Sequence, residues 1–194
     1  MRKSVVHTVV ASLLFVVSLT SCYKIDLDNI SDEISWKPDI SIPLGETTAT
    51  TKGNLSDPDK KVLTDSITFK LSDIISERGQ VDSLILRLNI ENEFPIVWNM
   101  YVYSQNVQPN HLLYGPKKIS AGKIDTDTGE STIPNKMSPE NIPLNSEQID
   151  FLYLSDVLVI KFEYLKAVEP PHDDIEYQLK TQIGLQAKLN MAYE

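Results

Sequence analysis

Cysteine, glycine and histidine are scarce in this 194-residue chain, and each scarcity removes a class of function. The sequence holds one cysteine, which excludes a disulfide within the chain, cysteine-rich zinc sites and iron–sulfur clusters. Its seven glycines form neither a phosphate-cradling loop nor a Gly-x-Ser-x-Gly nucleophile elbow. There is no His-Glu-x-x-His motif among the three histidines. We therefore expect no enzyme, no cofactor and no bound metal.

The balance of charge argues against a second class of function, nucleic-acid binding. Eighteen Lys and Arg residues stand against 27 Asp and Glu residues, a formal net charge of −9. Arg2 and Lys3 belong to the N-terminal segment described next, so the rest of the chain carries −11 and only two arginines, Arg78 and Arg87. A chain this acidic is poorly suited to phosphate backbones, and we expect no nucleic-acid partner.

The first 21 residues have the layout of a secretory signal. Arg2 and Lys3 form a short basic start, and the stretch from Val9 to Leu19 is almost wholly apolar. A transmembrane helix needs about 20 apolar residues, whereas this stretch is shorter and ends in small residues. An uncleaved membrane anchor with an incidental cysteine is the alternative interpretation.

The single cysteine closes this segment. Leu19-Thr20-Ser21-Cys22 resembles the lipobox of bacterial lipoproteins, in which cleavage precedes the cysteine and its sulfur receives a diacylglycerol. The resemblance implies that residues 1–21 are a lipoprotein signal peptide and that Leu19, Thr20 and Ser21 form the signal-peptidase motif. Cys22 would be the lipidation site, carrying acyl chains such as palmitate and making membrane lipid a partner. Two or more chains, at about 0.8 kcal/mol per buried methylene, hold a protein stably on a membrane.

Residues 22–35 form an acidic tether with little periodicity. Its spaced acids are loosely similar to the export signals that send some Bacteroidota lipoproteins to the cell surface. This similarity predicts a protein anchored by lipid in the outer membrane. Its domain would be exposed at the cell surface or face the periplasm.

Strands dominate the prediction for residues 36–194, which we take as one domain. Alternating or continuous apolar runs predict strands over 40–44, 67–71, 83–90, 94–103 and 157–165, with weaker strand signals over 111–125. A helical turn is expected at 72–77 and loops at 47–65 and 126–143, with one weak strand as an alternative inside 47–65. A short helix is expected from the cap Asn145, with Gln148 completing a capping box, to near Ser155.

The last predicted strand is the most regular. Apolar residues and one threonine occupy every odd position from Tyr177 to Tyr193, and we expect this strand to pair with 157–165 as a hairpin through a turn at 170–174. Many short strands, turn clusters and one short helix predict an all-β fold. The expected architecture is mainly an antiparallel β-sandwich, immunoglobulin-like in outline.

Three acidic segments are candidates for chemistry. His172-Asp173-Asp174 offers metal-ligand types, but consecutive residues rarely converge on one ion, so a solvated hairpin turn is favoured. The run from Asp125 to Glu130 alternates acids as calcium loops do. Its glycine at position five and Lys136 at position twelve depart from the EF-hand, which favours an exposed turn. Glu91 and Glu93 are a candidate carboxylate pair for glycoside hydrolysis, although solubilising charge is the simpler interpretation.

Aromatic side chains are the remaining functional hint, because they could form a stacking surface for sugars or a partner. We expect Trp98 in the core and leave open whether Trp36 is exposed or caps the domain. His111 has no partner in the sequence. The other aromatic candidates are Tyr101, Tyr103, Tyr114, Tyr153 and Tyr164.

Two stretches are similar to Bacteroidota outer-membrane lipoproteins of no agreed activity: Trp-x-Pro-x-Ile-x-Ile-Pro-Leu-Gly at 36–45 and Leu-x-Ile-Glu-Asn-Glu-Phe-Pro-Ile at 88–96. The resemblance implies localisation at the outer membrane and a β-rich fold, and it assigns no functional residue except Cys22. We therefore expect a lipid-anchored binding or assembly module of the cell envelope with a glycan or protein partner. A fimbria-like structural subunit and, behind it, a glycan-active enzyme stay as alternatives.

Overall fold

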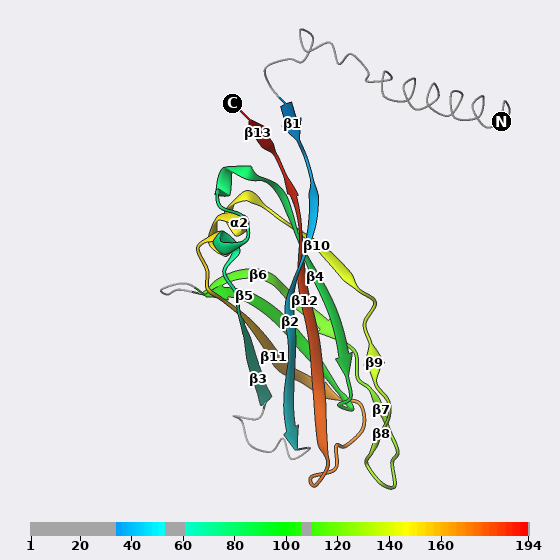
Figure 1. Ribbon diagram of the computed structural model, residues 1–194. Helices are drawn as coiled ribbons and strands as arrows, with labels where there is room; N and C mark the ends of the chain where they lie inside the picture. The colour runs from blue at the N-terminus through cyan, green and yellow to red at the C-terminus, as the bar shows by residue number, and fades with distance from the viewer. Residues whose placement is uncertain (1–33, 53–60, 106–109, 194) are drawn as a thin grey trace, which may run out of the picture. The chain divides into compact units, whose positions relative to one another are not determined.

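Alternating apolar residues build two antiparallel sheets that face each other across one core (Figure 1). The computed structural model describes residues 34–52, 61–105 and 110–193. The chain divides into two compact units, residues 1–35 with 192–194 and residues 36–191, and the second holds the two large sheets. Leu19, Thr20, Ser21 and Cys22 lie outside the described residues. Within the described part, no helix is both long and apolar enough to cross a membrane.

The first sheet has the strand order β10-β4-β12-β2, with β9 also paired to β4. Its strands are β2 (Asp39–Lys52), β4 (Val81–Asn92), β9 (Asn135–Lys136), β10 (Glu140–Leu144) and β12 (Glu176–Leu189). The second sheet has the order β3-β11-β5-β6. Its strands are β3 (Val62–Thr68), β5 (Ile96–Gln105), β6 (His111–Ile119) and β11 (Val157–Ala167).

Short elements complete the chain. A two-stranded ribbon joins β7 (Lys123–Ile124) to β8 (Ser131–Ile133), and a separate two-stranded sheet pairs β1 (Ile34–Trp36) with β13 (Met191–Tyr193). Two 3-10 turns, η3 (Leu71–Asp73) and η4 (Arg78–Gln80), precede β4, and the helix α2 (Ser146–Tyr153) precedes β11.

The strand order is that of a jelly roll. Taking the eight main strands in chain order, the first sheet contains the first, eighth, third and sixth, and the second contains the second, seventh, fourth and fifth. This is the two-Greek-key arrangement of jelly-roll sandwiches. The all-β antiparallel sandwich is thereby confirmed. Its connectivity differs from the immunoglobulin-like outline, which has its own strand order.

Period-two side chains fill the space between the sheets. In β12 every odd residue from Tyr177 to Leu189 is buried, as predicted, and in β5 the residues Ile96, Trp98, Met100 and Val102 are fully buried. Trp98 is 0% exposed and packs edge-on against Phe94, with ring centroids 5.4 Å apart. The prediction that Trp98 belongs to the core is confirmed.

The predicted hairpin between the last two strands is wrong. β11 pairs with β3 and β5 in the second sheet, whereas β12 lies in the first sheet between β2 and β4. The loop predicted over 47–65 is wrong at both ends, because β2 continues to Lys52 and β3 begins at Val62, while residues 53–60 lie outside the described residues. The loop over 126–143 contains β8, β9 and most of β10. Polar and threonine-rich strands at sheet edges lack the hydrophobic alternation that revealed the other strands.

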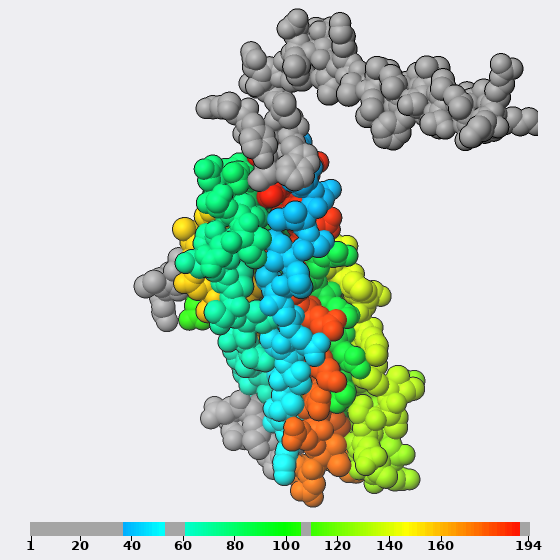
Figure 2. All heavy atoms as spheres, in the orientation of Figure 1, coloured from blue at the N-terminus to red at the C-terminus, as the bar shows by residue number. Residues whose placement is uncertain are grey.

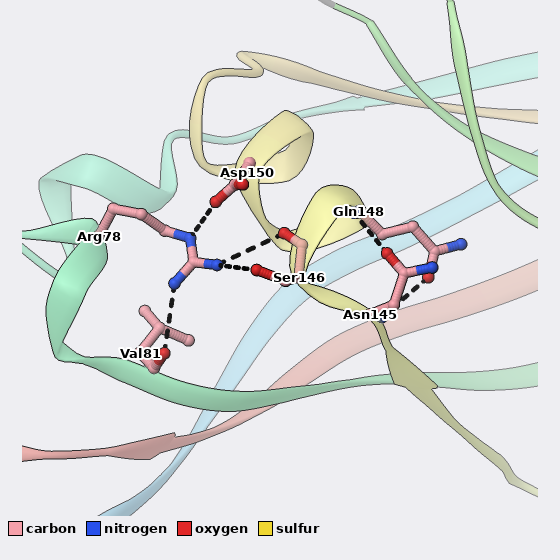
Figure 3. A network of polar contacts seen from close by, with 6 residues as sticks. All are labelled: Arg78, Val81, Asn145, Ser146, Gln148 and Asp150. Carbon is pink, nitrogen blue, oxygen red and sulfur yellow. Dashed lines mark hydrogen bonds and ion pairs between the residues drawn. The ribbon is translucent and has the colours of Figure 1, made fainter.

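The predicted helix is confirmed with its cap. The Asn145 side chain accepts a hydrogen bond from the Gln148 backbone N–H at 2.9 Å, and the Gln148 side chain accepts one from the Asn145 N–H at 3.0 Å (Figure 3). Arg78 fastens this helix to the segment before β4. Its Nε lies 2.6 Å from Asp150 Oδ1, and other guanidinium nitrogens donate to the Ser146 side chain and the Val81 carbonyl (Figure 3). Arg78, one of the two arginines of the domain, thus has a structural role.

Candidate functional site

A groove of about 550 Å³, which we call the end groove, lies among the described residues. Two segments far apart in the sequence line it. One is the β7–β8 ribbon, through Ile124, Thr126 and Thr128, and the other is the loop between β11 and β12. The loop contributes Glu169, Pro170, Pro171, His172, Asp173, Asp174 and Ile175. The size is typical of a small-ligand site.

Tyr177 of β12 connects the two segments through hydrogen bonds to both of them. Its buried hydroxyl donates to the Gly129 carbonyl at 2.8 Å and accepts from the His172 backbone N–H at 3.2 Å. Sequence reasoning treated Tyr177 only as a core residue of the last strand. Since a buried tyrosine hydroxyl needs a partner, a Tyr at the first inward position of a strand could have signalled such a loop clamp.

Gly129 lets the ribbon approach His172. Its φ of +77° lies in the left-handed region that favours glycine. A Cβ there would lie 2.3 Å from His172 Cγ. His172 is accordingly half-buried, whereas the sequence predicted a solvated turn. The two acidic segments that sequence analysis kept apart meet at this contact.

The Asp125 carboxylate shapes the ribbon. Its Oδ1 accepts from the backbone N–H groups of Thr128 and Asp127, both at 2.9 Å. These hydrogen bonds, Thr128 first, hold the pKa of Asp125 below its usual value, with a smaller electrostatic contribution from the nearby His172. The carboxylate therefore caps the turn at the tip of the ribbon. Across residues 34–52, 61–105 and 110–193, no three His, Cys, Asp or Glu side chains are grouped to hold a metal ion.

One carboxylate oxygen in the groove lacks a partner. Glu169 Oε2 is buried and makes no hydrogen bond to any residue that the structure describes. Glu169 also lines the groove. An unpaired buried acceptor favours a ligand that donates hydrogen bonds, such as a hydroxyl or an amine.

Replacing Gly129 with alanine tests the groove's architecture. The new methyl group cannot occupy the position now filled by the His172 ring, so we expect the two segments to separate and stability to fall by about 1–3 kcal/mol. Chemical denaturation of the full chain measures this loss. Gly79→Ala is the matched control, because no atom lies within 4 Å of a Cβ at Gly79. Equal stabilities for the two variants would contradict the assignment.

The remaining predicted candidates are scattered. Glu91 forms an ion pair with Lys136, Oε2 to Nζ 3.4 Å. The His111 ring stacks on Phe151 of α2, at the edge of a smaller hollow of about 210 Å³. The side chain of Trp36 lies outside the described residues.

Tyrosines take several structural roles. Tyr153 donates to the Ser76 carbonyl at 2.8 Å, Tyr164 accepts from the Ala167 N–H at 3.0 Å, and Tyr114 donates to Glu140.

Tyr101 and Tyr103 lie half-buried on the outer face of the second sheet, with nearly parallel rings 6.2 Å apart. Partial burial, and then the neighbouring Glu163, raise the pKa of Tyr101. Tyr101 and Tyr103 are thus two of the predicted aromatic candidates that lie next to each other on the outer face of a sheet.

Comparison with known proteins adds little to this geometry. No protein-family model and no curated protein matches the chain. Among solved structures, a chain of infectious bursal disease virus, Gx strain, matches with a TM-score of 0.39 and 10% identity over 79% of this chain. This chain covers 32% of that one. Mud crab tombus-like virus matches with a TM-score of 0.30 and 12% identity over 92% of this chain and 99% of that one. Desmodium yellow mottle tymovirus matches with a TM-score of 0.30 and 10% identity, over 84% and 91%.

Proposed function

We propose that the chain is a lipid-anchored binding module of the bacterial cell envelope, with the end groove as a ligand site. The observation that carries the binding role is the convergence of the β7–β8 ribbon and the β11–β12 loop on one polar groove, held by Tyr177 and Gly129. Rigid sheets that present loops at one end are a common way to build a binding site.

The address rests on the sequence. Leu19-Thr20-Ser21-Cys22 follows a basic start and an apolar stretch, and the acidic tether separates it from the domain. Acylation at Cys22 would fix the protein to the outer membrane, and the tether would allow the domain to reach its ligand. A glycan or a protein is the expected partner.

The sheet edges favour a binding module over a fimbria-like subunit. Strand exchange between subunits needs an accessible edge strand with free backbone groups. Three of the four edge strands of the two sheets contain a proline: Pro43 in β2, Pro116 in β6 and Pro143 in β10. Proline removes a backbone donor and interrupts added strands. The regular strand β12 is paired on both sides and offers no edge.

Protease shaving of intact bacteria tests the address. With an epitope tag at the C-terminus, we expect loss of the tag from whole cells, which would place the domain at the surface. Protection until the outer membrane is broken would contradict surface exposure and place the domain in the periplasm. An abundant periplasmic protein, probed on the same blot, controls for cell lysis.

Unboiled gels of the same cells separate the alternatives. A monomeric binding module runs as one band, whereas a strand-exchanged polymer forms a ladder that collapses on boiling. A glycan-active enzyme would instead release reducing sugar from envelope polysaccharide. Its candidate residues would be Glu169 and His172, which line the groove.

A further inference from the structure

The outer face of the first sheet carries a further hollow, of about 250 Å³, which Gly184 lines. Figure 2 looks onto this face, where β2, β12 and β4 run side by side. The outward residues of β12 are long and polar except at one position: Gln178, Lys180, Gln182, Gly184, Gln186 and Lys188. A glycine inside a central strand weakens it and often marks a close approach by a ligand or another backbone.

The register places the hollow between an arginine and a proline. Gly184 pairs with Arg87 of β4 on one side and with Pro43 of β2 on the other, and Arg87 pairs with Asn141 of β10. The missing side chain at Gly184 therefore opens a depression in the middle of a four-strand row. Pro139 adds a further apolar wall.

Arg87 uses only one of its hydrogen-bond donors within the described residues. Its Nε donates to Asn141 Oδ1 at 3.0 Å, which orients the guanidinium. Among the described residues no carboxylate forms an ion pair with Arg87, and none accepts from its terminal nitrogens. Arg78, in contrast, forms an ion pair with Asp150 and donates to Ser146 and to the Val81 carbonyl. The Arg87 guanidinium is exposed and forms no ion pair within the described residues, and its planar fork matches a carboxylate.

A row of amides borders the same hollow. Asn89 Nδ2 donates to Gln182 Oε1, and Gln182 Nε2 donates to Glu46 Oε2, both at 2.9 Å. These two hydrogen bonds fix the orientation of both amides, and no side chain among the described residues donates to Oδ1 of the exposed Asn89. The hollow thus combines an apolar floor about the size of one sugar ring, a cationic fork on one side and a fixed acceptor beside it.

We propose that this hollow binds one sugar residue that carries a carboxylate, as in a uronic acid. Arg87 would pair with the carboxylate, Asn89 would accept from a ring hydroxyl, and the C–H face of the ring would lie over Gly184 between the two prolines. The site is separate from the end groove. Its relevance as a glycan receptor rests on the proposed envelope address, but the binding itself does not.

Binding of simple glycosides to the full chain, purified in detergent, tests the proposal by calorimetry or ligand-observed NMR. We expect methyl glucuronide or methyl galacturonide to bind at least tenfold more tightly than methyl glucoside. Arg87→Gln should remove this preference by weakening the acidic sugar at least tenfold, since it deletes a charge-assisted pair. Gly184→Thr should abolish binding of both sugars by filling the hollow.

Matched variants keep the test interpretable. A Cβ at Gly184 would meet only Ile42 O at 3.3 Å and Pro43 Cα at 4.0 Å, and the backbone there is not left-handed, so the threonine variant should fold. Gln186→Thr makes the same change to threonine two residues further along the same face and should leave binding unchanged. Unfolding temperatures of all variants verify folding.

Any of three results would overturn the inference. The first is equal affinity for acidic and neutral glycosides, and the second is a Gly184→Thr variant that binds the acidic glycoside as tightly as the wild type. The third is a tripeptide with a free C-terminal carboxylate that competes as well as the acidic glycoside does. The last would indicate a peptide site. A failure of the envelope proposal would be seen separately, because it changes the shaving and fractionation results and not the binding of purified protein.

Discussion

Replacing Cys22 with alanine is expected to abolish incorporation of labelled palmitate and to leave the precursor uncleaved. The thiol is the only group in the chain that can accept the diacylglycerol as a thioether, since no other cysteine exists. Lipidation precedes cleavage in lipoproteins, so the variant should keep its first 21 residues. The measurement is metabolic labelling with palmitate, followed by intact-mass analysis and membrane fractionation.

Ser21→Ala is the control, because a small residue stays in front of the cysteine and labelling should persist. Wild-type protein should remain with the outer membrane after a high-salt wash, as two or more acyl chains hold it there. An unlabelled wild-type protein, or label retained in Cys22→Ala, would remove the basis for the lipoprotein interpretation.

Local periodicity predicted the inward faces of the strands but not their partners. The alternation from Tyr177 to Leu189 and the capping box at Asn145 depend on neighbours within a few residues, and both are confirmed. The partner of β12 depends on distant segments: Leu185 pairs with Leu86 and with Ile42. In a jelly roll most consecutive strands lie in opposite sheets, so the usual expectation that sequential strands pair fails here.

The candidate sites likewise combine residues that the sequence pattern identified with contacts that depend on the fold. The sequence singled out His172 and the Asp125 segment, but only the fold brings them together through Tyr177 and Gly129. Gly184 was visible as the one small residue among the long outward side chains of β12. Its meaning required the register that sets it beside Arg87.

Asn92, at the end of β4, is a buried polar residue that the sequence pattern did not single out. It is 0% exposed. Its Nδ2 donates to the carbonyls of Ile96 at 2.9 Å and Ser120 at 2.8 Å, and its Oδ1 accepts from the Phe94 N–H at 3.0 Å. One side chain therefore satisfies three backbone groups where β4 turns into β5.

Asn92→Ala should destabilise the domain by about 3–5 kcal/mol, because each orphaned buried backbone group costs about 1–3 kcal/mol. For a domain of this size the unfolding temperature should fall by about 10 °C, measured by circular dichroism or calorimetry. Asn89→Ala is the matched control on the same strand: its amide is exposed, and its loss should change stability by no more than about 0.5 kcal/mol. Similar unfolding temperatures for the two variants would contradict this role of Asn92.

Asn92→Asp separates lost hydrogen bonds from a simple cavity. The new carboxyl could still accept from the Phe94 N–H, but when ionised it would face the Ile96 and Ser120 carbonyls, so its pKa should be raised in the folded state. The folded protein then binds more protons than the unfolded one, and stability falls as pH rises through this range. Measured against Asn92→Ala at each pH, Asn92→Asp should be the more stable variant near pH 4 and lose that advantage by pH 7. A difference independent of pH would show that packing, and not the pattern of donors, is what Asn92 contributes.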